Sequence, residues 1–264
     1  MSRLAQFNDC ISIVVSSCDS FFDAWRPFAF FFRKFWPDCP FTVRLVVNHL
    51  ELRSEFIHAI RVGDDKGWAT NMHAALQQVT TPYVLYFQED YFLTSAPDEE
   101  QLARDFEFAL KEDAASLCFR DLSGLEPQLA RTADRLVSVP RDSTGRTRLQ
   151  VTLWKREALA HLLRPGETAW DMEARGSQRA RDLRLFAYAR NADAPLRYLM
   201  SAIVRGLWTR EALALCAEHG LAIQPHFRRE LAEGKWPRRW NRARTRLAFA
   251  SSLARQRGRP VELD

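Results

Sequence analysis

The sequence YVLYFQEDYF, residues 83–92, decides the fold. Its first five residues are aliphatic or aromatic and follow the breaker Pro82, which is typical of a strand buried on both faces of a mostly parallel sheet. The strand then ends at the carboxylates of Glu89 and Asp90. Because ligands of open α/β sheets bind at the carboxyl ends of strands, this acid pair can hold a divalent cation or a polar ligand. The alternative is that the two acids only cap a turn.

Strand and helix patterns alternate before this stretch. Apolar runs predict strands at residues 11–15, 41–47 and 57–62. Apolar residues spaced three and four apart predict helices at residues 21–36 and 69–79. Such alternation predicts an α/β sheet with helices on its faces.

The alternation continues after the acid pair. The same patterns predict helices at 98–111, 155–163 and 208–219, and strands at 115–119, 135–139, 150–154 and within 185–198. The C-terminal half therefore extends the α/β sheet that the N-terminal half begins.

Composition and cysteine usage indicate an intracellular globular protein. The 264 residues, 47% of them hydrophobic, can bury the core of one elaborated domain. The five cysteines show neither a CxxC pair nor metal-ligand spacing, which predicts reduced thiols in the cytoplasm. We expect no signal peptide in residues 1–10, and the apolar region 21–36 is too short and too charged to span a membrane.

The net charge of +5 is concentrated near the C-terminus. Residues 228–259 contain eleven Lys or Arg and two Glu, a local charge of +9. This basic tail, in which tryptophans are interspersed, is a candidate for peripheral contact with anionic lipid on the inner face of the cytoplasmic membrane. The alternatives are a solvated helix packed on the core and a disordered end. Because the body is not basic, nucleic acid is not the expected partner.

Residues 63–92, GDDKGWATNMHAALQQVTTPYVLYFQEDYF, resemble the nucleotide-sugar half of the GT-A glycosyltransferases. A loop with Gly and a large residue, a helix with an Asn, a Thr-Pro-Tyr entry, a hydrophobic strand and an acid follow in that order. The resemblance implies a GT-A-like α/β fold, a mostly parallel twisted sheet flanked by helices with a helical basic C-terminal appendage. The catalytic domain would cover 1–226, with a donor-binding half to about residue 120 and an acceptor half from about 121, and the tail would cover 227–264.

The resemblance implies a divalent cation at the acid pair. In that family an Asp-any-Asp motif after the central strand binds Mn²⁺ or Mg²⁺ together with the donor diphosphate. Here Asp90 matches the last Asp, Gln88 stands in place of the first, and Glu89 can compensate. One fewer carboxylate weakens a site for a hard cation. Without metal, arginines would have to stabilise the leaving diphosphate.

The resemblance also implies contacts with the base and the ribose of a nucleotide. The matching positions are Ser17 and Asp19 after the first strand, Asp65 and Trp68 in the loop, and Asn71 on the helix. A carboxylate accepts hydrogen bonds from a base N–H or ribose hydroxyls, and an aromatic ring can stack. Alternatively, Asp65 caps the following helix and Trp68 belongs to the core.

The second informative stretch is GETAWDMEARGSQRAR, residues 166–181. Thr168 followed three residues later by Asp171 is typical of a capping box, which predicts a helix here. In inverting GT-A enzymes an acid near the start of a helix in this region deprotonates the acceptor hydroxyl. The resemblance therefore assigns Glu173 as the base, with Asp171 as the second choice.

Two arginines follow on the same predicted helix, Arg175 and Arg179. They can face the donor diphosphate, because a guanidinium suits phosphate geometry, or they can pair with the helix's own early acids. In the second case those acids only stabilise the helix through a favourable interaction with its dipole.

Together these features predict a bacterial glycosyltransferase that moves a hexosyl or related sugar from a nucleotide-diphosphate donor. The acceptor would be a hydroxyl of a glycan or lipid-linked glycan in surface polysaccharide or lipopolysaccharide synthesis, and the transfer would invert the anomeric configuration. The alternatives are a non-catalytic nucleotide-sugar-binding protein with a degenerate site and a sugar nucleotidyltransferase.

Overall fold

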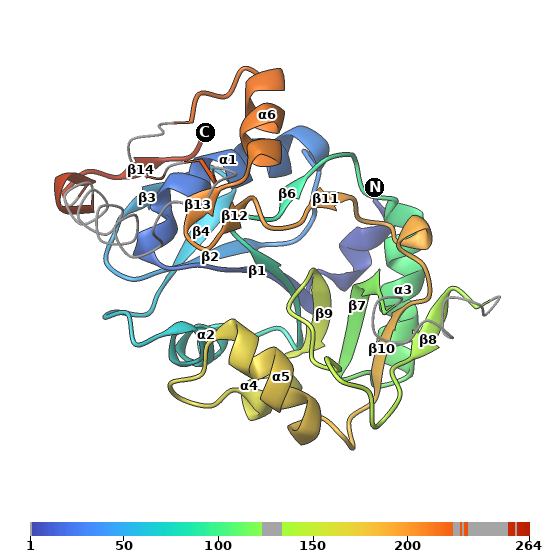
Figure 1. Cartoon of the computed structure of the whole chain (residues 1–264). Helices are drawn as coiled ribbons and strands as arrows, with labels where there is room; N and C mark the ends of the chain where they lie inside the picture. The colour runs from blue at the N-terminus through green and yellow to red at the C-terminus, as the bar shows by residue number, and fades with distance from the viewer. Residues whose placement is uncertain (1, 123–133, 224–227, 229, 232–252, 257) are drawn as a thin grey trace.

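A computed structural model describes residues 2–122, 134–223, 228, 230–231, 253–256 and 258–264. Its centre is an eight-stranded sheet with the strand order β4-β2-β1-β5-β9-β7-β10-β8 (Figure 1). The strands are β1 (Ile11–Ser16), β2 (Val43–Val47), β4 (Ile57–Arg61), β5 (Tyr83–Gln88), β7 (Ser116–Asp121), β8 (Leu136–Ser138), β9 (Thr152–Lys155) and β10 (Leu185–Tyr188).

The sheet is mostly parallel, as predicted. β4, β2, β1 and β5 are parallel neighbours, and β7 is parallel to β10. β9 is inserted antiparallel between β5 and β7, and β8 is antiparallel to β10. The stretch around residues 83–92 thus supplies an interior strand, with β1 on one side and β9 on the other.

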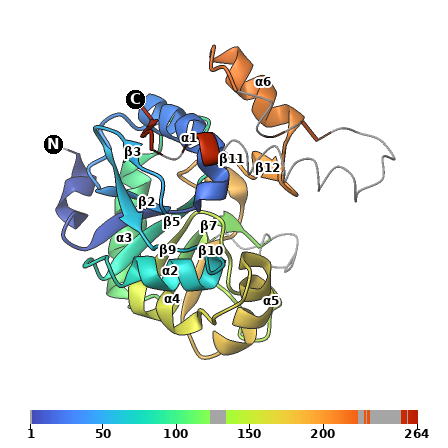
Figure 2. The same cartoon turned by 90° about the vertical axis from the view of Figure 1, so that its left-hand side faces the viewer.

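Helices cover both faces of the sheet. They are α1 (Phe22–Phe35), α2 (Trp68–Leu76), α3 (Glu99–Lys111), α4 (Arg156–Leu162) and α5 (Ala169–Arg179), whereas α6 (Arg210–Glu218) projects away from the sheet (Figure 2). α2, α4 and α5 form one layer, in which α2 and α4 lie side by side (Figure 2). α1 and α3 pack on the opposite face (Figure 1). The predicted helix-covered α/β architecture is therefore confirmed.

Alternate residues of β5 enter the two core layers. Tyr83, Leu85 and Phe87 pack in the layer that contains α1, whereas Val84 and Tyr86 pack in the layer that contains α2. This follows from the period of two along a strand and explains why the whole run is apolar.

In the described part of the chain, three short pairs of strands lie outside the main sheet. β6 (Phe92–Leu93) pairs with β11 (Tyr198–Leu199), β12 (Ile203–Val204) pairs with β13 (Leu207–Trp208), and β3 (Leu52–Arg53) pairs with β14 (Val261–Glu262). Short 3₁₀ helices are η1 (Arg3–Phe7), η2 (Asp19–Phe21) and η4 (Asn191–Asp193). β6 follows the acid pair in the sequence, and the backbone of Ile203 in β12 contacts Asp90.

Much of the expected helical tail, residues 227–264, lies outside the described residues. In its described part, residues 253–256 are helical, while β14 adds to β3 as a parallel strand. The buried side chains of Val261 and Leu263 anchor the end of the chain on the α/β body.

All five cysteines lie in the described part of the chain and none forms a disulfide. Among the described residues, no helix combines the length and the apolar character that crossing a membrane requires.

Candidate functional site

The acid pair lies at the carboxyl end of β5 in a buried environment. Glu89 is 7% exposed and Asp90 is 6% exposed. Asp90 Oδ2 accepts a hydrogen bond of 3.2 Å from the backbone N–H of Ile203, whereas its buried Oδ1 has no hydrogen-bond partner. Burial raises the pKa of Asp90 to about 6, and burial together with the charge of Asp90 raises the pKa of Glu89 well above its usual value. Both carboxyl groups are thus poised to bind a proton or a cation.

A positive charge near these acids comes from Arg228, which the sequence indicated only as the start of the basic tail. Its guanidinium donates to both carboxylate oxygens of Asp23, at 3.0 and 3.1 Å, and to two backbone carbonyls. The positive charge of Arg228 acts against the rise in the pKa values of Glu89 and Asp90. No local pattern could have revealed this, because the arginine is one of many in its segment.

The acid pair offers a limited set of ligands for a divalent cation. Among the described residues, no group of three or more His, Cys, Asp or Glu could hold a metal ion. The unpartnered Oδ1 of Asp90 nevertheless fits a hard cation that takes its other ligands from a diphosphate and water. Gln88 adds no carboxylate to this set, and its amide nitrogen lies 3.4 Å from the carbonyl oxygen of Leu149.

Asp65 and Asn71 hold the loop before α2 in a fixed shape. Asp65 Oδ1 accepts hydrogen bonds from the side-chain amide of Asn71 at 2.8 Å and from the backbone N–H of Gly67 at 3.0 Å. Asn71 Oδ1 in turn accepts from the backbone N–H of Lys66 at 3.1 Å. Gly67 has a φ of +88°, which only glycine adopts readily. The predicted nucleotide contacts Asp65 and Asn71 thus lie together in a preformed loop.

Trp68 begins α2 and is half-buried. Its indole N–H donates to Ser16 Oγ at 3.0 Å and lies 3.3 Å from Tyr86 Oη, at the carboxyl ends of β1 and β5. The ring packs against the core layer of α2. Much of the Trp68 side chain therefore belongs to the core, as the alternative predicted, while its exposed part lies beside the loop of Asp65.

Ser17 and Asp19 follow β1 and are engaged in hydrogen bonds. Asp19 is buried, and its carboxylate accepts from three consecutive backbone N–H groups, those of residues 48–50, at 2.8, 2.8 and 2.9 Å. Ser17 Oγ accepts from the indole N–H of Trp25 at 2.7 Å. Asp19 thus organises the turn after β2, and a nucleotide contact by either residue stays a prediction.

Glu173 is tied to the end of β5 through one residue, Leu149. Glu173 Oε1 accepts from the backbone N–H of Leu149 at 2.8 Å. The carbonyl oxygen of Leu149 accepts from Tyr91 Oη at 3.2 Å and from Gln88 at 3.4 Å. The structure therefore brings together the two stretches that the sequence singled out, residues 83–92 and 166–181.

Burial raises the pKa of Glu173. The Leu149 N–H and the positive charge of Arg148 oppose this rise without cancelling it. Sequence reasoning missed Leu149 and could not have found it, because a contact made by backbone atoms leaves no signature in residue type.

A close approach between α5 and the segment before β9 fixes the position of Leu149. Thr147 Oγ1 lies 3.0 Å from the carbonyl oxygen of Met172 and 3.2 Å from that of Glu173. A Cβ atom on Gly176 would lie 2.9 Å from Thr147 Oγ1. The glycine in the middle of the helix therefore permits the contact, and it is the one sequence signal that this packing left.

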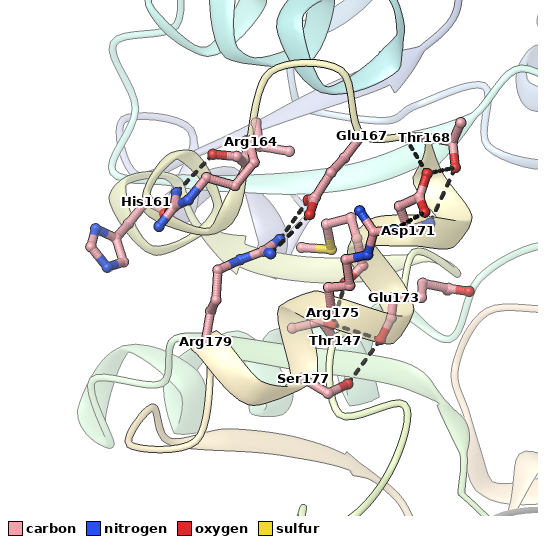
Figure 3. A network of polar contacts seen from close by, with 12 residues as sticks. Thr147, His161, Arg164, Glu167, Thr168, Asp171, Glu173, Arg175, Ser177 and Arg179 are labelled. Atoms are coloured by element: carbon pink, nitrogen blue, oxygen red, sulfur yellow. Dashed lines mark hydrogen bonds and ion pairs between the residues drawn. The ribbon is translucent and has the colours of Figure 1, made fainter.

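The other predicted residues of α5 face different partners (Figure 3). Asp171 completes a capping box, in which its carboxylate accepts from the backbone N–H of Thr168 at 3.1 Å and from the Thr168 hydroxyl at 2.7 Å. These hydrogen bonds lower the pKa of Asp171. The predicted capping box is confirmed. Its hydrogen bonds engage the carboxylate of Asp171, the second choice for the base.

The two arginines of α5 are ion-paired away from Leu149. Arg179 donates to both carboxylate oxygens of the buried Glu167 at 2.9 and 2.6 Å (Figure 3). Arg175 lies 3.5 Å from Asp171 and has a largely exposed side chain. The alternative of pairing with the helix's own early acids thus describes Arg175, which pairs with Asp171. Arg179 instead pairs with Glu167, which precedes α5, and Glu173 turns toward Leu149.

No protein-family model matches the chain. A comparison with curated proteins also gives no match.

Several solved structures resemble the chain at low identity. Residues 1–349 of TarS from S. aureus are 14% identical over 72% of this chain, with a TM-score of 0.46. Glucosyl-3-phosphoglycerate synthase from Mycobacterium tuberculosis, with phosphoglyceric acid, is 13% identical over 96% of this chain and 82% of its own, with a TM-score of 0.37. The galactosyltransferase LgtC, with donor and acceptor sugar analogs, is 13% identical over 91% of this chain and 95% of its own, with a TM-score of 0.36.

The chain spans 59% of the TarS structure. Identities of 13–14% and TM-scores below 0.5 describe a similar fold at most, and no conclusion about activity rests on them.

Proposed function

We propose that this chain is a glycosyltransferase that moves a sugar from a nucleotide-diphosphate donor to a hydroxyl of a bacterial surface glycan, with inversion at the anomeric carbon. The observation that carries the proposal is the link from Glu173 through Leu149 to the end of β5. It joins a carboxylate of raised pKa to the strand end that carries a buried acid pair.

The donor half of the proposed site is the region of β1, the loop before α2 and the end of β5. The preformed loop of Asp65 and Asn71 supports binding of the nucleoside, with Trp68 beside it. Ser17 and Asp19 line the same strand ends. A cation held by Asp90, with Glu89 beside it, would neutralise the charge that develops on the departing diphosphate.

Glu173 is proposed as the general base. As the acceptor hydroxyl oxygen attacks the anomeric carbon, its proton passes to the Glu173 carboxylate. The bond from the anomeric carbon to the diphosphate oxygen breaks, and that electron pair leaves with the nucleotide. Attack opposite the leaving group gives inversion. A raised pKa strengthens a carboxylate as a base, which suits Glu173 for this role.

The proposal also includes the predictions for Asp171, for the two arginines of α5, for the domain boundaries and for the location of the enzyme. Asp171 is the reserve base, and Arg175 and Arg179 can approach a diphosphate only if their ion pairs with Asp171 and Glu167 open. The domain boundaries 1–226 and 227–264, with the donor half ending near residue 120, are also proposed. So is a cytoplasmic enzyme whose basic tail contacts the inner membrane face near a lipid-linked acceptor.

A second candidate function is a nucleotide-sugar-binding protein without transfer activity. The observation that favours it is the restricted ligand set for metal. The Gln88 amide contacts Leu149, and the described residues hold no cluster of three or more metal-ligating side chains. Such a protein would bind the donor and release no nucleotide.

The first experiment screens the full chain for stabilisation by UDP-, GDP-, dTDP- and CMP-sugars, each with and without Mn²⁺. A ligand that binds only the folded state raises its apparent stability, by about 2.7 kcal/mol at a hundredfold excess over Kd. A shift with one nucleotide family supports the donor site. No shift with any of the four contradicts both candidates.

The second experiment measures sugar transfer from that donor by Glu173→Gln and by a matched control, Glu157→Gln. Glu157 is an exposed acid in the first turn of α4. We expect Glu173→Gln to keep the stabilisation by the donor and to lose at least a hundredfold in kcat, a typical contribution of a general base. The control should transfer like the wild type. Full transfer activity in Glu173→Gln would show that Glu173 is not the general base.

A further inference from the structure

Gln88 stands where the resembled motif has an acid, yet its side chain has a definite partner. It is half-buried at the end of β5, and its amide nitrogen donates to the carbonyl oxygen of Leu149 at 3.4 Å. Tyr91 Oη donates to the same oxygen at 3.2 Å. Two side chains, one from the last residue of β5 and one from the segment after it, thus converge on one backbone acceptor.

Both the backbone and the side chain of Leu149 are fixed by contacts. Its carbonyl is bound by Gln88 and Tyr91, and its side chain is only 1% exposed in the core layer of α2 and α5. Two residues earlier, Thr147 is bonded to the backbone of α5. The backbone dihedrals of Leu149 therefore have little freedom, and its N–H has one direction available.

That direction is toward Glu173. The N–H of Leu149 donates to Glu173 Oε1 at 2.8 Å, so the carbonyl contact of Gln88 and the carboxylate contact of Glu173 lie on the two sides of one residue. The N–H and the carbonyl of Leu149 belong to the peptide groups before and after its Cα, and the φ and ψ angles of Leu149 set their relative directions. Loss of the Gln88 contact frees these angles to change, and such a change redirects the N–H that binds Glu173.

The chemistry at position 88 explains the residue type. A carbonyl oxygen needs a donor, which the amide of Gln provides, whereas an ionised Asp or Glu can only accept. An Asp at this position would face the Leu149 carbonyl with a second acceptor and would place a third carboxyl group next to Glu89 and Asp90. The first acid of the motif and the contact with Leu149 are therefore incompatible.

We propose that Gln88 is a positioning residue for Glu173, acting through Leu149, in place of the acidic metal ligand that the resembled motif has at this position. The inference rests on the proposed function for the role of Glu173. Its geometric part, that Gln88 orients the Glu173 carboxylate, is measured without any substrate.

Other charged groups near Glu173 must stay constant in the test. Arg148 acts on Glu173 from the segment before β9, and Glu173 in turn acts on Tyr91, between β5 and β6, and on Cys118 of β7. On α5 itself, Asp171 and Arg175 lie within one turn of Glu173 but pair with each other. None of these side chains is altered by a substitution of Gln88.

The variants are Gln88→Leu, which removes the donor, and Gln88→Asp, which restores the acid of the motif. Tyr91→Phe removes the other donor to Leu149 and keeps the ring, so it tests the same link if Gln88→Leu folds poorly. The matched control is Gln78→Leu, because Gln78 also donates to a backbone carbonyl, that of Arg61 at 3.0 Å, but at the far end of α2.

Four quantities are measured on the full chain. They are the pKa of Glu173 by ¹³C NMR of its side-chain carboxyl, the hydrogen-exchange rate of the Leu149 amide, and kcat and KM for the donor in transfer. For Gln88→Leu we expect amide exchange about tenfold faster and the pKa of Glu173 higher by about 0.5, since a well-placed donor to the carboxylate is weakened. We expect kcat to fall about tenfold with donor KM unchanged, and the control to match the wild type.

Gln88→Asp separates the two roles of position 88. Our inference expects the same rise in the pKa of Glu173 and no gain in Mn²⁺-dependent donor binding. An unchanged pKa of Glu173 with tighter Mn²⁺-dependent binding would overturn it, as would a wild-type pKa and a wild-type Leu149 exchange rate in Gln88→Leu. If the wild type transfers no sugar while the pKa and the exchange rate change as expected, the positioning by Gln88 stands and the proposed function fails.

Discussion

Arg228 and Asp23, 205 residues apart in the sequence, form a two-point ion pair whose side chains are only 5% and 4% exposed. The guanidinium also lies over the ring of Phe21, 4.7 Å from its centroid. Through this contact the C-terminal segment is attached to α1 close to the acids at the end of β5. The pair therefore joins the stability of the fold to the electrostatics of the candidate site.

Replacing Arg228 with Met should destabilise the protein by about 3–5 kcal/mol, because Asp23 would be left as a buried charge without its partner. Urea unfolding at neutral pH measures the loss. The matched control is Arg210→Met, whose partner Glu230 is half exposed, and there we expect a loss of about 0–1 kcal/mol. A loss below about 1 kcal/mol for Arg228→Met would mean that Asp23 is well solvated, contrary to the burial seen here.

Gly176→Ala should be destabilising although alanine is the better helix former. The added Cβ would lie 2.9 Å from Thr147 Oγ1 and 3.3 Å from Met172 Sδ, so α5 or the segment of Thr147 must shift. Overpacking of this kind costs about 1–3 kcal/mol, more than the gain of about 1 kcal/mol in helix propensity. Thermal and urea unfolding measure the sum of the two effects.

The double variant Gly176→Ala/Thr147→Ala isolates the clash. Removing the hydroxyl should make the alanine at position 176 less costly than it is in the presence of Thr147, which gives a favourable coupling in a double-mutant cycle. Strict additivity of the two substitutions would show that the close approach of α5 and the segment before β9 does not limit position 176.

The sequence predicted those features that periodicity and capping encode. The apolar run of β5, the alternation of strands and helices, and the capping box of Thr168 and Asp171 all depend on residues near each other in the chain. The antiparallel insertion of β9 could not be predicted, because an apolar strand pattern carries no direction. The contacts of Leu149 could not be predicted either, because they are made by backbone atoms. The burial of Arg228 could not be predicted because it depends on a segment far away in the sequence.

A buried polar cluster around Asp105 lies apart from the candidate site. Asp105 of α3 is fully buried, accepts hydrogen bonds from Tyr188 and Gln101, and pairs with Arg135 at 2.9 Å. Burial raises the pKa of Asp105 to about 6, despite the opposing effect of these partners. Its usual value of 3.8 holds in the unfolded chain.

Because the pKa of Asp105 is raised in the folded state, its protonated form favours folding. This contribution is fully present below pH 4 and is lost as the pH rises through about 6. From pH 4 to pH 7 the free energy of unfolding of the wild type should fall by on the order of 2 kcal/mol more than that of Asp105→Asn, which cannot ionise. Urea unfolding of both proteins at intervals of one pH unit measures the difference.

Asp113→Asn is the matched control for this titration. Asp113 is an exposed acid that lies outside the Asp105 cluster and pairs with Lys155, so Asp113→Asn should keep the fall in stability that the Asp105 cluster causes between pH 4 and pH 7. If the profiles of the wild type and Asp105→Asn ran parallel between pH 4 and pH 7, Asp105 would be ionised throughout that range. Its charge would then be balanced by Arg135 and Tyr188 inside the core, and the cluster would act as a buried ion pair with no proton bound.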